Sequence, residues 1–196
     1  MDLRSINKVF LIGIGGIGMS ALAKYFLQKN TQVYGYDREA SAITKNLTSL
    51  GSNLIHNLND FNINEFKSDI DNTLVIYTPA ISKGHPLLIK FEENEFNVFK
   101  RAEVLQKISE NSKCIAVAGT HGKTTTSAIL AHILKVSDLK FCAFVGGIMI
   151  NYNSNFLYNG EDYILVEADE FDRSFLKLNP NSVSYTHLTL PTTMLV

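Results

Sequence analysis

Residues 8–20 read K-V-F-L-I-G-I-G-G-I-G-M-S and decide the fold of the first half of the chain. The apolar run Val9–Ile12 stops at a cluster of glycines, which is typical of a buried parallel strand that ends in a tight turn. Gly13, Gly15 and Gly18 fit the spacing G-x-G-x-x-G, and apolar residues then recur at helical spacing. A strand, a glycine loop and a helix in this order predict a nucleotide-binding α/β fold.

Strands and helices continue to alternate after this first helix. The predicted elements are a strand at Thr31–Tyr36, a helix at Glu39–Leu50 capped by Gly51, and a strand at Thr73–Tyr77. The β-α-β-α-β order predicts a Rossmann-like, doubly wound parallel sheet.

Asp37 ends the second predicted strand, 19 residues after Gly18. This spacing is typical of a dinucleotide site, with a pyrophosphate at the helix N-terminus and the carboxylate on a ribose hydroxyl. The pattern specifies a diphosphate and a ribose, but it does not specify a nicotinamide. An NAD-dependent oxidoreductase, a protein that binds a UDP-sugar, and a turn without a ligand all remain open for this motif taken alone.

A second glycine loop follows another strand, because Ile115–Ser127 reads I-A-V-A-G-T-H-G-K-T-T-T-S. Glycines let backbone N–H groups curl around phosphate oxygens, and the start of a helix adds unpaired donors. A lysine here reaches the terminal phosphates, and the next hydroxyl reaches Mg²⁺. The first glycine of the general P-loop pattern falls at Val117, but the shorter core is intact. We therefore predict an ATP site made by Gly119, Thr120, His121, Gly122, Lys123, Thr124 and Thr125.

The second unit is predicted to begin after a helix at Arg101–Glu110, with the boundary near residues 108–113. We expect residues 1–110 to bind the substrate and residues 111–181 to be the first part of a P-loop domain. Its predicted elements are strands at Cys114–Ala118, Phe141–Phe144 and Tyr163–Val166 and a helix at Lys123–Val136. Glu167 follows the last of these strands, where P-loop enzymes commonly place a carboxylate for magnesium. Thr124 and Glu167 are therefore the predicted metal ligands.

Composition excludes several classes of protein. The chain has 196 residues with 18 basic and 19 acidic side chains, so no excess of positive charge favours a nucleic acid or an anionic membrane. No apolar run reaches membrane-spanning length, and the first residues lack the apolar region of a signal peptide. Cys114 and Cys142 each lie in an apolar stretch, as buried thiols of a reducing compartment do. We expect a cytoplasmic protein.

Several motifs together resemble the Mur ligase family over about residues 7–180. They are G-I-G-G-I-G-M-S at 13–20, Y-T-P-A-I-S at 77–82, K-R-A-E-V-L at 100–105, G-T-H-G-K-T-T-T at 119–126 and V-E-A-D-E-F-D-R-S-F at 166–175. The double glycine at 146–147 also looks like the family.

This resemblance implies an ADP-producing ligase of peptidoglycan precursor synthesis, with ATP and Mg²⁺, that joins L-alanine to UDP-N-acetylmuramate. In such enzymes the muramoyl carboxylate attacks the γ-phosphate of ATP, and the amine then displaces phosphate from the acyl phosphate. Lys123 and His121 would act in catalysis. The residues implied to face the UDP part are Gly15, Gly16, Ile17, Gly18, Met19, Ser20 and Asp37. Those on the muramoyl side are Asp172, Arg173 and Ser174.

Residues 182–196 read S-V-S-Y-T-H-L-T-L-P-T-T-M-L-V and do not continue the family pattern. We expect this segment to be a foreign tail and the chain to be an N-terminal fragment without ligase activity of its own. Three alternatives stay open: an oxidoreductase, a non-catalytic nucleotide-binding module, and a Mur-type ligase that adds a peptide.

Overall fold

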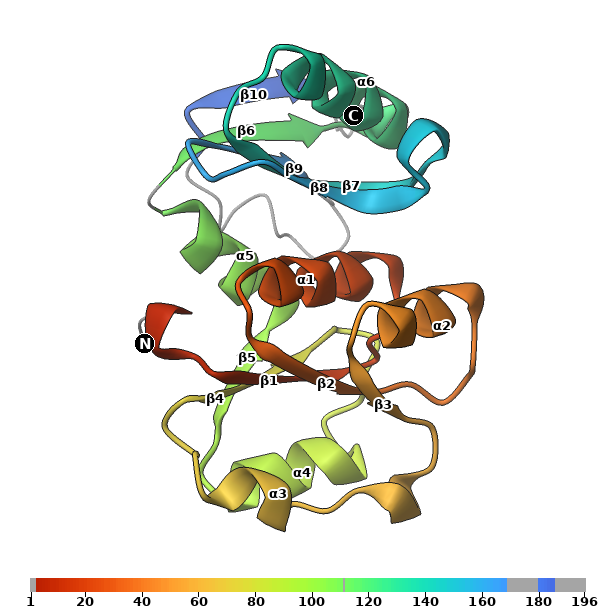
Figure 1. Cartoon of the computed structure of the whole chain (residues 1–196), viewed down its shortest axis with the longest axis vertical. Coiled ribbons are helices and arrows are strands. Elements are labelled where there is room, and N and C mark those ends of the chain that lie inside the picture. Colours follow the sequence, from red (N-terminus) through yellow and green to blue (C-terminus); the bar gives the residue numbers. More distant parts are fainter. Residues whose placement is uncertain (1–2, 111, 169–179, 186–196) are drawn as a thin grey trace, which may run out of the picture.

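The computed structural model describes residues 3–110, 112–168 and 180–185 and contains two five-stranded sheets (Figure 1). The first sheet has the strand order β3-β2-β1-β4-β5, and all of its strand pairs are parallel. This arrangement confirms the predicted Rossmann-like parallel sheet. The strands are β1 (Lys8–Ile12), β2 (Gln32–Tyr36), β3 (Asn53–Ile55), β4 (Thr73–Tyr77) and β5 (Asn97–Lys100).

Strand β1 is apolar throughout because both of its faces are buried. Val9 and Leu11 belong to one hydrophobic cluster, whereas Phe10 and Ile12 belong to another on the opposite face. The helices of this unit are α1 (Ile17–Gln28), α2 (Ala42–Ser49), α3 (Asn64–Lys67), α4 (Pro86–Glu93) and α5 (Arg101–Ser109), with short 3₁₀ turns at Leu3–Ser5 and Leu58–Asp60. Figure 1 shows α1, α2 and α5 on one face of the sheet and α3 and α4 on the other.

Helix α2 begins later than the predicted residue 39 because its cap lies at Ser41. The Ser41 hydroxyl accepts a hydrogen bond from the Thr44 N–H at 3.2 Å, and the Thr44 hydroxyl accepts one from the Ser41 N–H at 2.8 Å. This reciprocal capping box satisfies two donors that would otherwise be unpaired at the helix start. The sequence therefore placed the helix correctly but predicted its start three residues too early.

The second sheet has the order β10-β6-β9-β7-β8. Its strands are β6 (Lys113–Ala118), β7 (Phe141–Met149), β8 (Ser154–Tyr158), β9 (Tyr163–Glu167) and β10 (Ser182–Tyr185), and its helix is α6 (Lys123–Val136), with a 3₁₀ turn at Ile150–Tyr152. Only β8 runs antiparallel to its neighbour in the described part of this sheet. Strand β10 pairs with β6, so residues 182–185 extend the sheet, although the sequence left them unassigned.

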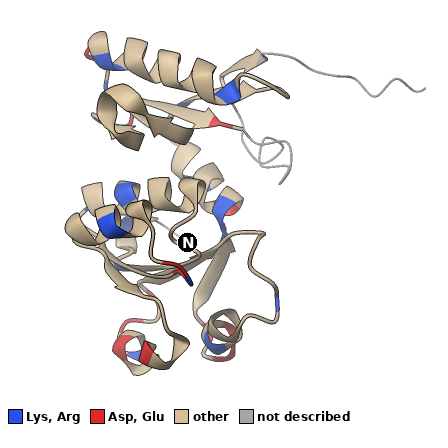
Figure 2. Ribbon diagram, turned by 90° about the vertical axis from the view of Figure 1, so that its right-hand side faces the viewer, with Lys and Arg blue, Asp and Glu red and all other residues tan. Residues whose placement is uncertain are grey.

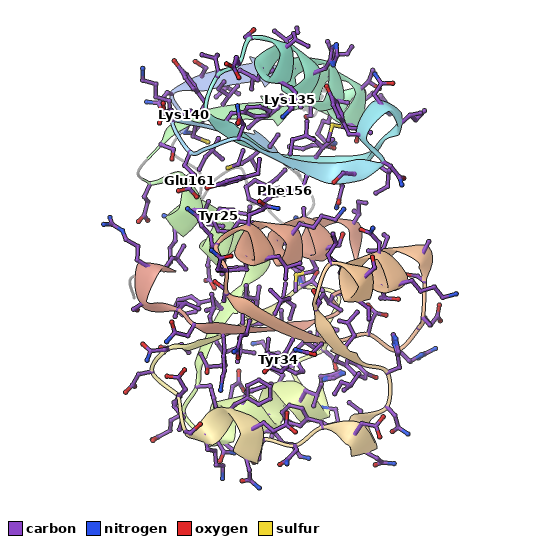
Figure 3. All side chains as sticks on the ribbon, in the orientation of Figure 1. Tyr25, Tyr34, Lys135, Lys140, Phe156 and Glu161 are labelled. Atoms are coloured by element: carbon purple, nitrogen blue, oxygen red, sulfur yellow. The ribbon has the colours of Figure 1, made fainter. Side chains whose placement is uncertain are left out.

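Helix α1 is shared between the two sheets. It packs on β1 and β2 below and on β7 and β8 above, while α6 covers the other face of the second sheet. The ring of Tyr25 on α1 lies 5.8 Å from that of Phe144 and 6.3 Å from that of Phe156, and Figure 3 shows Tyr25 and Phe156 between the layers. The helix that follows the first glycine loop is therefore fixed against the unit that carries the second.

Basic and acidic residues are found in both layers (Figure 2). Within the described ranges, no helix has the length and apolar character needed to cross a bilayer.

Candidate functional site

The second glycine loop leaves β6 and enters α6 through a left-handed turn. Gly122 is the N-cap of α6 with φ of 76°, and Gly119 has φ of 132°. Residues other than glycine rarely adopt either backbone angle. The Lys123 ammonium donates a hydrogen bond to the Gly119 carbonyl oxygen at 2.8 Å. The loop is thus curled over the helix N-terminus, with the lysine lying across it.

Thr124 and Glu167 meet at the mouth of this loop. The Thr124 hydroxyl donates to Glu167 Oε1 at 2.8 Å, and the Gly146 N–H donates to Glu167 Oε2 at 2.8 Å. Strand β9 brings Glu167 there because it pairs in parallel with β6, with Glu167 opposite Val117. The structure therefore brings the two predicted metal ligands into contact.

The double glycine at the end of β7 allows this close approach. A Cβ on Gly146 would lie 2.6 Å from Glu167 Oε1, and a Cβ on Gly147 would lie 2.8 Å from Thr124 Cγ2. Both distances are shorter than ordinary carbon contacts. The sequence pointed to these glycines only through a family motif, since no local rule says what a glycine in a strand will face.

The remaining residues predicted for ATP lie on the rim of the same loop. His121 is exposed and sits in the bend before α6, and Thr125 is exposed in the first turn of that helix. Beside this turn is a groove of about 420 Å³, lined by Thr124, Thr125, Ala128, His132, Met149 and Tyr152 among others. The His132 ring Nδ1 lies 2.6 Å from the Tyr152 hydroxyl on its wall. A phosphate ligand in the loop would lie next to this groove.

The first glycine loop is braced by Asp37. Gly13 has φ of 83°, and the Gly15 N–H donates to Asp37 Oδ2 at 2.8 Å. The other carboxylate oxygen accepts the Glu39 N–H at 3.2 Å, and the His56 ring Nδ1 donates to the Asp37 carbonyl oxygen at 2.7 Å. Asp37 thus holds the loop in this structure, and its contact with a ribose stays a prediction.

Among the other residues predicted for UDP, those of the loop and those of the helix differ in exposure. Gly16 is exposed at the loop, whereas Met19 is 2% exposed and Ser20 is fully buried. The Ser20 hydroxyl donates to the Ile17 carbonyl oxygen at 2.8 Å. The side chains of Met19 and Ser20 therefore hold the helix start in place from the inside.

Two residues that the sequence did not assign lie against the start of α1. A Cβ on Gly18 would clash with Arg101 Nη1 and would lie 3.0 Å from Arg101 Cζ. From the second sheet, the amide of Asn155 donates to the Ile17 carbonyl oxygen at 2.5 Å and to the Ser20 hydroxyl at 2.9 Å. Both contacts join residues far apart in the sequence, so local patterns carry no signal for them.

Asn155 also accepts a hydrogen bond from a buried cation. The Lys24 ammonium donates to Asn155 Oδ1 at 2.8 Å and to the Ser154 hydroxyl at 3.2 Å, and burial lowers the pKa of Lys24. Asn155 follows the carboxyl end of β7 and contacts the start of α1. Figure 1 shows that the two glycine loops lie on the same side of the molecule. The remaining predicted site residues, Asp172, Arg173 and Ser174, lie outside the described residues.

Comparison with known proteins finds that this chain is similar to ligases. The family model described as Mur ligase family, catalytic domain, matches residues 8–113. A curated UDP-N-acetylmuramate–L-alanine ligase from Flavobacterium psychrophilum is 50% identical over 188 residues, which cover 96% of this chain and 42% of that protein. A ligase of the same name from Porphyromonas gingivalis is 49% identical over 178 residues. The 96% coverage carries the similarity past Pro180, farther than the motifs alone indicated.

Two solved structures that are similar to this chain are also ligases. The UDP-N-acetylmuramate-alanine ligase of Thermotoga maritima superposes with a TM-score of 0.76 at 32% identity, covering 91% of this chain and 40% of that one. A UDP-N-acetylmuramate:L-alanyl-γ-D-glutamyl-meso-diaminopimelate ligase from Neisseria, with a TM-score of 0.78 at 22% identity, shares the fold. The chain spans about two-fifths of the length of the curated relatives it matches.

Proposed function

Because the chain belongs to the Mur ligase family, we propose that it carries the UDP-binding loop and the ATP-binding loop of a ligase that joins L-alanine to UDP-N-acetylmuramate. The names of the relatives at 46–50% identity support this substrate pair. Residues 1–110 would hold the UDP part of the substrate, and residues 111–181 would begin the ATP-binding unit.

The observation that carries this proposal is the contact between Thr124 and Glu167 at the N-terminus of α6. A hydroxyl and a carboxylate 2.8 Å apart, beside a curled glycine loop with its own lysine, match the parts that hold a nucleoside triphosphate. A turn that only caps a helix needs neither the lysine nor the carboxylate. The same arrangement has no role in an NAD-dependent oxidoreductase, and none of the relatives named above is one.

The same two residues fit a magnesium ion. Mg²⁺ prefers oxygen ligands and is usually held by one or two carboxylates together with substrate phosphates. Within residues 3–110, 112–168 and 180–185, no cluster of three or more His, Cys, Asp or Glu side chains could hold a metal on its own. Thr124 and Glu167 would therefore hold the ion with the phosphates of ATP, and the bound ion would neutralise phosphate charge.

The proposed reaction has two steps. A carboxylate oxygen of the muramoyl group forms a bond to the γ-phosphorus of ATP while the bond to the ADP oxygen breaks. The amine of L-alanine then attacks the acyl carbon, loses a proton, and phosphate leaves. In the first step Lys123 would stabilise the charge that spreads over the transferring phosphoryl oxygens. His121, at the loop's exposed bend, would shape that loop or contact a phosphate.

The proposal is tested by calorimetric titration of the chain with ATP and Mg²⁺ and, separately, with UDP-N-acetylmuramate. Lys123→Ala should weaken ATP binding by about 10- to 100-fold, since a charged hydrogen bond to phosphate is lost. The UDP-substrate affinity should stay unchanged. Lys135→Ala, an exposed lysine in the last turn of the same helix, is the matched control. ATP binding that survives Lys123→Ala intact would remove the basis for the assignment, and binding of NADH in place of UDP would favour the oxidoreductase.

A further inference from the structure

We propose that Arg101 is a binding residue for the diphosphate of the UDP substrate and that Gly18 is a glycine to admit its guanidinium. This inference rests on the proposed function, because it assumes that a UDP group binds at the first glycine loop. Arg101 is the first residue of α5 and is partly buried. It lies 83 residues after Gly18 in the chain, but the fold places the two side by side.

The contact between these residues is close and specific. The three heavy atoms nearest to a Cβ on Gly18 all belong to Arg101: Nη1, which that Cβ would overlap, Cζ at 3.0 Å and Cδ at 3.3 Å. In the usual dinucleotide fingerprint the third glycine allows the helix to approach the strand. Here the space that Gly18 leaves is filled by the guanidinium.

A cation beside Gly18 would favour the binding of a diphosphate at this loop. Residues 13–20 contain no charged side chain, and the Asp37 carboxylate lies against the loop at Gly15. A diphosphate at this loop would therefore meet the N-terminal dipole of α1 but also a nearby carboxylate, which repels it. A guanidinium over Gly18 supplies the opposite charge and a planar set of donors that matches phosphate oxygens.

Lysine at position 101 would not be equivalent. An ammonium carries the charge but lacks the fork that donates two parallel hydrogen bonds to a phosphate. The inference therefore predicts a graded series, with arginine binding best, lysine intermediate and methionine weakest. A purely structural role for Arg101 would change the stability of the chain without this order in UDP affinity.

Gly18→Ala offers an independent way to move the guanidinium. Gly18 lies inside α1 without a positive φ, where alanine is a better helix former than glycine, so the variant should keep its helix. The added methyl group would clash with Arg101 Nη1 and displace it. If both variants act through the same guanidinium, their effects must not add.

The experiment measures the affinities of UDP and ATP by calorimetry, and that of uridine by ligand-detected NMR, for the parent chain and five variants. Arg101→Met and Gly18→Ala should each weaken UDP binding by about 10- to 100-fold, and the double variant should be no weaker than either single variant. Uridine and ATP affinities should change by less than about threefold, because neither ligand places a diphosphate at this loop. Lys107→Met, on the same helix, is the matched control and should bind UDP like the parent chain.

The outcomes separate this inference from the proposed function. If Arg101→Met binds UDP within about twofold of the parent chain, or if its effect adds to that of Gly18→Ala, the inference is overturned while the UDP site stands. If the parent chain binds neither UDP nor uridine, the proposed function and the inference fall together. Thermal unfolding of each variant checks that it is folded, and Arg101→Lys gives a second measure of the guanidinium's contribution.

Discussion

Replacing Asn155 with leucine should destabilise the chain strongly, although the leucine side chain has the same number and branching of heavy atoms. Asn155 is fully buried, and it connects the Lys24 ammonium to the first turn of α1. The substitution removes one hydrogen bond from a charged group, worth about 1.5–3 kcal/mol, and the amide's bonds to α1, worth about 1 kcal/mol. Among the described residues, it also leaves the ammonium of Lys24, which is 9% exposed, with the Ser154 hydroxyl at 3.2 Å as its one remaining hydrogen-bond partner. We expect a loss of about 3–4 kcal/mol in the free energy of unfolding.

Urea unfolding followed by circular dichroism measures this loss, since the chain contains no tryptophan for fluorescence. Asn159→Ala is the control, because its amide bonds a backbone carbonyl at 3.2 Å but lies on the surface. Adding Lys24→Met to Asn155→Leu removes the buried charge together with its partner, so the double variant should recover at least about 1.5 kcal/mol relative to the sum of the single effects. Additive losses, or an Asn155→Leu variant as stable as Asn159→Ala, would show that Asn155 does not stabilise the buried Lys24 ammonium.

Two further predictions concern the second sheet. Gly146→Ala should weaken binding of ATP with Mg²⁺ by about tenfold, because the new Cβ would lie 2.6 Å from Glu167 Oε1; Gly84→Ala, which meets nothing within 4 Å, should bind like the parent chain in the same titration. Burial raises the pKa of the Cys114 thiol from 9.0 to about 11, so the stability that it contributes is fully present below pH 9 and is lost as the pH rises toward 11. Urea unfolding across this range should show the advantage of the parent chain over Cys114→Ala shrinking; a constant difference would contradict the assigned burial.

The parts of the fold that could be predicted from the sequence are those with a strong local signal. Continuous apolar runs that stop at glycines identified β1 and β6, and helical spacing identified α1 and α6, the latter at the residues observed. Strands β3 and β8 were missed because they are short or carry mixed side chains. Strand β10 was missed because Ser182–Tyr185 has little apolar character and gains its place from pairing with β6.

The candidate site also contains contacts that the sequence could predict and contacts that it could not. Thr124 and Glu167 could be paired from the sequence, because carboxyl ends of parallel strands meet at one edge and each residue follows such a strand. The contacts of Gly18 with Arg101 and of Asn155 with α1 could not, since they depend on how α5 and β8 pack against α1. The sharing of α1 between two sheets is likewise a property of packing, not of any periodicity within the helix.

We propose that one chain carries two separate nucleotide sites on the same side of the fold. This proposal is tested most directly by titrating the chain with ATP and Mg²⁺ in the presence of saturating UDP-N-acetylmuramate. One ATP should bind per chain, with the UDP substrate retained. Displacement of the UDP substrate by ATP, or the absence of any ATP binding, would contradict it.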